Sequence, residues 1–176
     1  FHEIATTLRP YGTSEGYVRE RDKIFSDIYG KTLLQEVRRY ALRAREIAKK
    51  ESFDVIHAHD WLSFLAGIEA KKVSGKPLIL HMHATEFDRT GGQGVNQEVY
   101  NIERAGMQFA DGIIAVSNHT KQKIVEHYGI PAEKIEVVHN GIDECDYANI
   151  PDKLSELKRA GQKIVLFAGR ITIQKG

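Results

Sequence analysis

Four of the eight histidines in this 176-residue chain fall at the ends of two predicted strands, in the segments His57-Ala58-His59-Asp60 and His81-Met82-His83-Ala84. Polar residues also follow two further predicted strands, at Ser117-Asn118 and His139-Asn140-Gly141. In open parallel sheets, ligands bind outside the carboxyl ends of the strands. The sequence therefore predicts one polar edge of a sheet, where imidazole, carboxylate and amide groups could meet a ligand.

Several of these residues have an alternative structural explanation. Asp60 and Ser117 each stand where a helix N-cap is expected, and Asn140-Gly141 is also typical of a turn that tolerates positive φ. For these positions a structural role and a functional role are equally favoured. They are kept as candidates for lining a ligand cleft.

The histidines divide by their depth in the predicted strands. His57 and His81 lie deeper, and we expect them to be hydrogen-bonded core residues. His59 and His83 lie nearest the loops, where a polar side chain faces a cleft. A polar loop with three glycines follows His83, which favours a functional role for this residue.

A metal site is the main alternative at the same edge. Residues two apart on a strand point to one face, so His57 with His59, and His81 with His83, each form such a pair. Together with a nearby carboxylate, two such pairs could bind zinc and support a metal-dependent hydrolase. The candidate carboxylates are Asp60, Glu86 and Asp88.

A second candidate ligand site ends the chain, after the predicted strand 163–168. Gly169 lets the backbone approach a ligand, and Arg170 and Lys175 could neutralise a diphosphate. The segment lacks the Gly-Lys-Ser/Thr ending of a Walker motif. On spacing alone, a basic surface loop would look similar.

Alternating helices and strands must position these residues. Apolar periodicity predicts helices over 33–48, 61–73, 96–109, 118–128 and 153–160, and short apolar strands over 53–59, 78–83, 113–116, 135–139 and 163–168. Such strands are typical of a parallel sheet buried on both faces. Right-handed crossovers then predict an α/β, doubly wound, Rossmann-like fold.

The composition of the chain argues against some classes of function. With 25 basic and 24 acidic residues the formal net charge is +1, which argues against binding nucleic acid or an anionic membrane. No apolar run is long enough to span a bilayer. Cys145 is the only cysteine, so no disulfide can form within the chain, and we expect a cytoplasmic location.

Taken in order, five segments resemble the successive motifs of the retaining glycosyltransferases related to glycogen and starch synthases, the GT-B type. The resemblance covers roughly residues 31 to 176. It rests on His57-Ala58-His59-Asp60-Trp61, on His83, on Ala110 to Ser117, on Val138 to Asp143 and on Gly169 to Gly176. It implies two Rossmann-like domains facing a cleft, the first binding mainly the acceptor and the second the nucleotide-sugar.

The resemblance also implies a division of the chain. Residues 1–145 would be a partial N-terminal, acceptor-side domain, residues 146–162 a linker with a short helix, and residues 163–176 the truncated start of the donor domain. We therefore expect a fragment that is inactive by itself. Its last strand, deprived of neighbours, is expected to be disordered, to pack on the first domain or to pair with another molecule, which would be a self-association of the fragment.

Roles for individual residues follow from the same resemblance. His83 matches the family's histidine beside the transferring sugar, and Asp60 matches an aspartate on the acceptor side. Gly169, Arg170 and Lys175 match the loop that binds the donor diphosphate and stabilises the leaving group. The expected cleft-lining residues are His59, Trp61, Ser117, Asn140 and Gly141. No metal and no cofactor beyond the nucleotide-sugar substrate are expected.

The sequence departs from the family pattern at three points. The family's glycine-rich loop near the first strand and its glutamate pair in the second domain are absent from these residues. Ala84 follows His83, where the glycogen synthase branch has asparagine, and this argues against glucan elongation. A transferase acting on a lipid, polysaccharide or small acceptor is at least as compatible. A non-catalytic module that binds a nucleotide or a protein remains a further alternative.

Overall fold

The computed structural model of the chain describes residues 33–141, 152–163 and 165. The chain divides into two compact units, residues 1–139 and residues 140–176. The described part of the first unit contains the sheet and most of the helices, whereas the described part of the second contains α7 (Asp152–Arg159). The predicted domain boundary at 145/146 lies outside the described residues and stays a prediction.

The first unit is built on a parallel four-stranded sheet in the order β1-β2-β3-β4. Each strand neighbours the next one along the chain. The register pairs His59 with His81 and Leu80 with Ile113. The strands are β1 (Ile56–His59), β2 (Leu78–Met82), β3 (Gly112–Ala115) and β4 (Ile135–Val137). This confirms the predicted α/β, Rossmann-like class.

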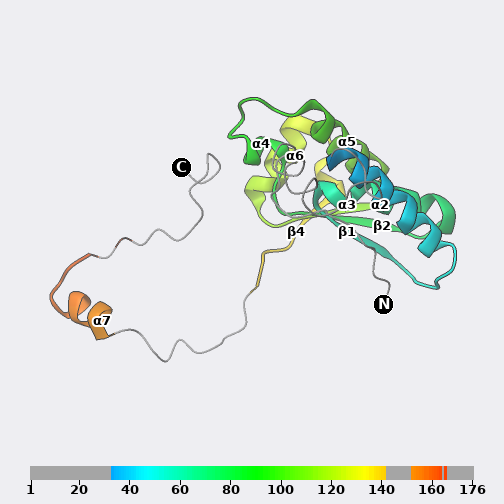
Figure 1. Cartoon of the computed structure of the whole chain (residues 1–176). Helices are drawn as coiled ribbons and strands as arrows, with labels where there is room; N and C mark the ends of the chain where they lie inside the picture. The colour runs from blue at the N-terminus through cyan, green and yellow to red at the C-terminus, as the bar shows by residue number, and fades with distance from the viewer. Residues whose placement is uncertain (1–32, 142–151, 164, 166–176) are drawn as a thin grey trace, which may run out of the picture. The chain divides into compact units, whose positions relative to one another are not determined.

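Helices connect the strands as the crossovers of a parallel sheet. Figure 1 shows them gathered on one side of the sheet. A strand order that follows the chain, with every crossover right-handed, places successive helices on the same face. The described helical elements of the first unit are α2 (Leu33–Ala48), α3 (Asp60–Ser74), α4 (Glu86–Arg89), α5 (Gln97–Phe109), α6 (Asn118–Tyr128) and the 3₁₀ turn η1 (Ala132–Lys134).

The helix ends follow local sequence signals. Asn96 caps α5, because its side-chain oxygen accepts hydrogen bonds from the N–H groups of Glu98 and Val99 at 3.0 and 3.2 Å. Gly75 and Gly129 end α3 and α6 in the left-handed region, at φ 69° and 65°. Glycine adopts that conformation without a Cβ penalty, so both helices stop there.

The helix-covered face of the sheet forms the hydrophobic core. Strand residues on this face are buried, including Leu78, Leu80 and Met82, none of which is exposed. They pack with apolar residues of α3, α5 and α6, namely Phe64, Ile68, Val99, Ile102, Met107, Ile124 and Tyr128. Leu33 and Val37 of α2 join the same cluster, and α2 packs along α3.

The opposite face differs from the expectation of strands buried on both sides. We call it the histidine face, because it carries His57, His59 and His81. His57 and His59 are exposed, and His81 is half-buried. Burial therefore alternates along β1 and β2, since α3, α5 and α6 all pack on the other face.

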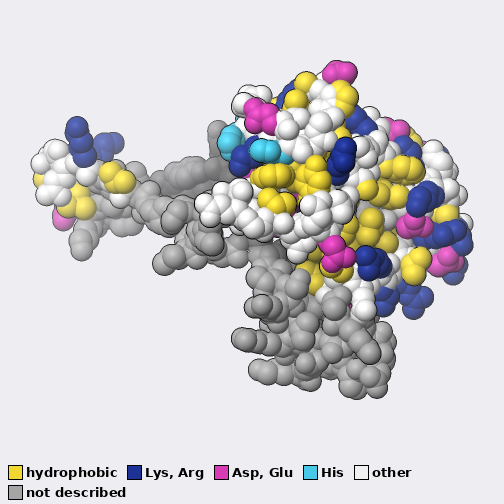
Figure 2. Space-filling model, turned by 90° about the horizontal axis from the view of Figure 1, so that it is seen from above, with side chains coloured by type: hydrophobic (Ala, Val, Ile, Leu, Met, Phe, Trp, Pro, Cys, Tyr) yellow, Lys and Arg dark blue, Asp and Glu magenta, His cyan; other side chains and the backbone are white. Residues whose placement is uncertain are grey.

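The side of the molecule seen in Figure 2 carries charges of both signs close together. Ion pairs such as Lys71 with Asp111 and Lys72 with Glu69 agree with that mixture. Among the described residues, no helix is long and apolar enough to cross a membrane. The cytoplasmic location and the self-association stay predictions.

Two local predictions differ from the structure. The loop after β2 contains a short helix, α4, that apolar periodicity did not indicate. The predicted strand 163–168 is not present at the two described residues, Lys163 and Val165. The rest of that segment lies outside the described residues.

Candidate functional site

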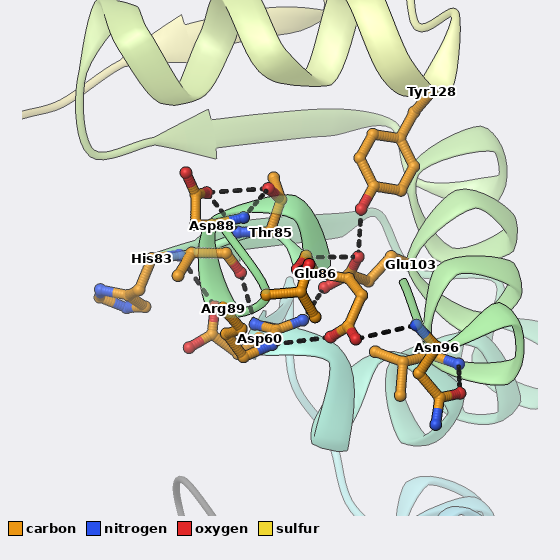
Figure 3. A network of polar contacts seen from close by, with 12 residues as sticks. Asp60, His83, Thr85, Glu86, Asp88, Arg89, Asn96, Glu103 and Tyr128 are labelled. Carbon is orange, nitrogen blue, oxygen red and sulfur yellow. Dashed lines mark hydrogen bonds and ion pairs between the residues drawn. The ribbon is translucent and has the colours of Figure 1, made fainter. Parts of the chain in front are cut away.

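Asp60 connects the ends of β1 and β2 at the polar edge of the sheet. Its Oδ1 accepts a hydrogen bond from the backbone N–H of His83 at 2.8 Å (Figure 3). Asp60 is the first residue of α3, and no side-chain cap closes that helix. The N-cap explanation for Asp60 is therefore wrong, because its carboxylate is bonded to the neighbouring strand instead.

The backbone of Asp60 is held in an unusual conformation. Among the described residues it is the non-glycine residue with positive φ, at 56°. A residue with a Cβ pays of the order of 1 to 2 kcal/mol to occupy the left-handed region. Such outliers gather at functional sites, where surrounding contacts hold them. Here the bond to His83 supplies one such contact.

His83 stands at the edge with an exposed side chain. Its Nε2 lies 3.1 Å from Nδ1 of His59, so the two imidazoles share a hydrogen bond. Figure 3 shows the ring of His83 pointing away from the buried polar groups of the following loop. The backbone of His83 is thus fixed by Asp60, while its ring is exposed and bonded to His59.

Burial and like charges act on the histidines of this edge. Burial lowers the pKa of His59, the neighbouring His57 and His83 lower it further, and Asp60 opposes them. Burial likewise lowers the pKa of His81, again with help from the surrounding imidazoles. Both rings therefore favour the neutral form at neutral pH.

The loop that follows His83 is anchored by a buried polar network (Figure 3). Glu103 of α5 has no exposed surface and accepts hydrogen bonds from Arg89, from the Tyr128 hydroxyl and from the Glu86 N–H. Arg89 also donates to the carbonyl of Ala84 at 2.7 Å. The network therefore holds the chain immediately after His83.

Thr85 begins this loop with a capping box. Its hydroxyl accepts from the Asp88 N–H at 3.3 Å, and the Asp88 carboxylate accepts from the Thr85 N–H at 2.8 Å. Lys123 of α6 bonds the same carboxylate. Asp88 thus links the loop to a neighbouring helix, and Glu86 and Asp88 are both committed to structural contacts.

Sequence reasoning missed the roles of Glu103, Arg89 and Tyr128. A signal was present, since Glu103 lies on the same helical stripe as Val99, Ile102 and Met107. A carboxylate on a buried stripe must find donors, because an unpaired buried charge costs several kcal/mol. That stripe could have predicted a buried partner for Glu103, although not its identity.

The other predicted site residues are placed as follows. Ser117 caps α6, because its hydroxyl accepts from the Thr120 N–H at 3.1 Å. Trp61 belongs to the core, with 9% of its surface exposed. Asn140 and Gly141 are exposed and belong to the second unit. The roles of these residues in lining a cleft stay predictions.

Two predictions about the deeper histidines were wrong. His57 is exposed, and neither ring nitrogen of His81 has a hydrogen-bond partner, so they are not hydrogen-bonded core residues. Both point to the histidine face, away from the packed helices. Gly169, Arg170 and Lys175 lie outside the described residues, and their contact with a diphosphate stays a prediction.

The chain is similar to a known protein family, to individual proteins and to solved structures. Residues 6–144 match the model of the family described as Glycosyltransferase Family 4. The chain is 28% identical over 148 residues to the uncharacterized glycosyltransferase MJ1607 of Methanocaldococcus jannaschii, covering 76% of this chain and 38% of that protein. It is 35% identical over 140 residues to alpha-maltose-1-phosphate synthase of Mycolicibacterium smegmatis, covering 72% and 35%.

A glycogen synthase of Mycobacterium tuberculosis is 29% identical over 143 residues, covering 78% of this chain and 34% of that protein. The chain thus spans between 34% and 38% of the length of these three relatives. Among solved structures, Anabaena Alr3699/HepE in complex with UDP and glucose superposes with a TM-score of 0.51 at 21% identity. That match covers 68% of this chain and 31% of the other, and it supports the fold alone.

Proposed function

Because the chain belongs to glycosyltransferase family 4, we propose that its complete gene product transfers a sugar from a nucleoside-diphosphate sugar to an acceptor with retention of the anomeric configuration. Residues of the first unit would provide the acceptor side of the cleft. The observation that carries the proposal is the fixed backbone and exposed imidazole of His83 at the carboxyl edge of the sheet. Ligands bind at that edge in open α/β sheets.

His83 would act on the sugar. As the bond to the diphosphate breaks, the sugar ring gains positive charge, and a neutral imidazole or a backbone carbonyl beside it stabilises that charge. Such stabilisation needs a group that does not move during the reaction. The hydrogen bond that the His83 N–H donates to Asp60 and the network around Arg89 and Glu103 supply that rigidity.

Asp60 would act mainly by positioning His83. Its Oδ1 is engaged by the His83 N–H. The carboxylate has a second oxygen, which is free to accept a hydrogen bond from an acceptor hydroxyl. This fits the acceptor-side role that the family resemblance implies.

Gly169, Arg170 and Lys175 would bind the donor diphosphate. Two cations beside a departing nucleoside diphosphate offset its growing negative charge, so the reaction would need no metal ion and no further cofactor. This part of the proposal rests on the sequence motif. The Anabaena Alr3699/HepE structures are complexes with UDP and with UDP and glucose, which agrees with a nucleotide-sugar donor.

The proposal covers acceptors of several classes, including a lipid, a polysaccharide or a small molecule. The relatives are named for different products, glycogen and alpha-maltose-1-phosphate. Ala84 argues against glucan elongation. The three relatives compared above are named as transferases or synthases, which gives the metal-dependent hydrolase no support.

The test uses the complete gene product with a panel of nucleoside-diphosphate sugars and simple glycoside acceptors. We expect acceptor-dependent release of nucleoside diphosphate and a product whose anomeric configuration, read by NMR, matches that of the donor. An inverted product would refute retention. Donor hydrolysis that requires an added metal and no acceptor would favour the hydrolase.

A further inference from the structure

The histidine face carries three imidazoles that the proposed sugar transfer does not use as a group. One ring nitrogen from each of His57, His59 and His81 lies within 4.8 Å of the others. The ring centroids are 4.3 Å apart for His57 and His59, and 4.8 Å apart for His59 and His81. We call these three residues the histidine triad.

Strand geometry explains why the triad converges. Residues two apart on β1 point to one face, and β2 pairs with β1 in parallel so that His81 lies beside His59. Neighbouring strands are about 4.8 Å apart. Two strands therefore bring three ring nitrogens to one spot without help from a loop.

His81 shows that the triad is incomplete by itself. Both of its ring nitrogens are buried, and neither has a hydrogen-bond partner. Leaving a buried polar group unpaired costs about 1 to 3 kcal/mol. A neutral imidazole carries one acceptor nitrogen, and a metal ion would satisfy that nitrogen by coordination.

We propose that His57, His59 and His81 bind one divalent transition-metal ion of the zinc, cobalt or nickel type, with one imidazole nitrogen each. Imidazole suits these metals, whereas calcium and magnesium require oxygen ligands. Three protein ligands leave a fourth position for water.

Binding requires a modest adjustment of the rings. Nitrogens around a tetrahedral zinc ion at about 2.1 Å lie roughly 3.4 Å apart. The triad must therefore close from a spacing of up to 4.8 Å. His57 is exposed, so its side chain can rotate without disturbing the core or the bond between His59 and His83.

The neighbouring His83 supports the orientation of His59. Because Nδ1 of His59 already shares a hydrogen bond with His83, His59 presents its Nε2 to the metal. Metal-bound histidines commonly bond a second group through their other nitrogen in this way. The proposed metal site does not depend on the proposed sugar transfer. The three histidines would bind a metal ion whether or not the carboxyl edge of the sheet is catalytic.

The experiment titrates Co²⁺ into the tag-free complete gene product and follows the visible absorption of cobalt bound to imidazole, with Zn²⁺ as competitor. We expect one ion per chain that Zn²⁺ displaces and Mg²⁺ does not. His57→Ala should weaken binding by roughly tenfold or more, and a His57→Ala/His81→Ala double variant should lose that ion.

His119→Ala is the matched control, because His119 is an exposed histidine outside the triad. It should bind the ion as the unmodified protein does. Circular dichroism of each variant separates loss of the site from loss of the fold, and His57→Ala changes an exposed residue. The proposal is overturned if no saturable binding occurs, or if the double variant retains the same number of ions with the same affinity.

Discussion

On the helix-covered face of the sheet, Ala58, Leu80 and Ile113 are closed off by helices, whereas the histidine face of the same strands leaves His57 and His59 exposed. The residues alternate along each strand, so every second position contributes to the core. Where the remaining positions are exposed, as at His57 and His59, they carry polar groups at little cost to stability. The difference indicates that, among the described residues, the hydrophobic core lies on one face of the sheet while the other face carries polar side chains.

The largest effect expected from this difference is a loss of stability on the covered face. Leu80 is fully buried, so Leu80→Ala should lower the free energy of unfolding by about 2 to 5 kcal/mol, through lost burial and a residual cavity. His57→Ala, on the opposite face of the neighbouring strand, should change it by less than about 0.5 kcal/mol. Urea unfolding measures both.

Equal losses in the two variants would contradict the division between the faces. A large loss in His57→Ala alone would show that the histidine face is packed in solution. Either result would also change the expectation that His57 is free to rotate.

A smaller effect is expected at Asp88, which links α4 to α6 on the covered side. Burial would raise the pKa of Asp88, but the hydrogen bonds from Lys123 and Thr85 outweigh it and lower the pKa below its usual value. The folded state then binds fewer protons than the unfolded state, so this carboxylate stabilises the fold above the usual aspartate pKa. That contribution disappears as the pH falls through the lowered pKa.

Asp88→Asn should therefore be less stable than the unmodified protein at neutral pH, by about 1 to 3 kcal/mol. The difference in the free energy of unfolding between Asp88→Asn and the unmodified protein should shrink as the pH falls below about 4. Unfolding curves at a series of pH values measure it. A difference that stays constant down to the lowest pH would show that the Asp88 carboxylate does not carry the effect.

Much of the fold was predictable from sequence, because apolar periodicity and helix caps act locally. The positions of β1 to β4 and of the helices from α2 to α6 followed from that pattern, apart from α4. Helix α4 depends on the capping box of Thr85 and on Lys123 of a distant helix. Neither contact was evident in the sequence, because the segment has the composition of a polar loop with several glycines. The burial of each face of the sheet also depends on which helices pack against that face. The apolar pattern of the strands does not specify those helices.

The candidate site was predictable only in part. The placement of His83 at the edge followed from the rule that strand ends form the ligand edge. The bond between Asp60 and the His83 N–H joins residues 23 positions apart, and local patterns favoured a helix cap just as well. Likewise, the convergence of His57 and His81 depends on strand register, which the sequence alone did not fix.

The measurement that tests the central claim most directly is turnover by the complete gene product carrying His83→Ala, compared with His119→Ala. Both histidines are exposed, but only His83 lies at the ligand edge bonded to Asp60. We predict that His83→Ala lowers kcat for sugar transfer by about a hundredfold or more, by analogy with the loss of a group that stabilises transition-state charge, and that His119→Ala leaves it unchanged. Equal turnover in both variants, with the fold intact, would contradict the assignment of His83 to the reacting sugar.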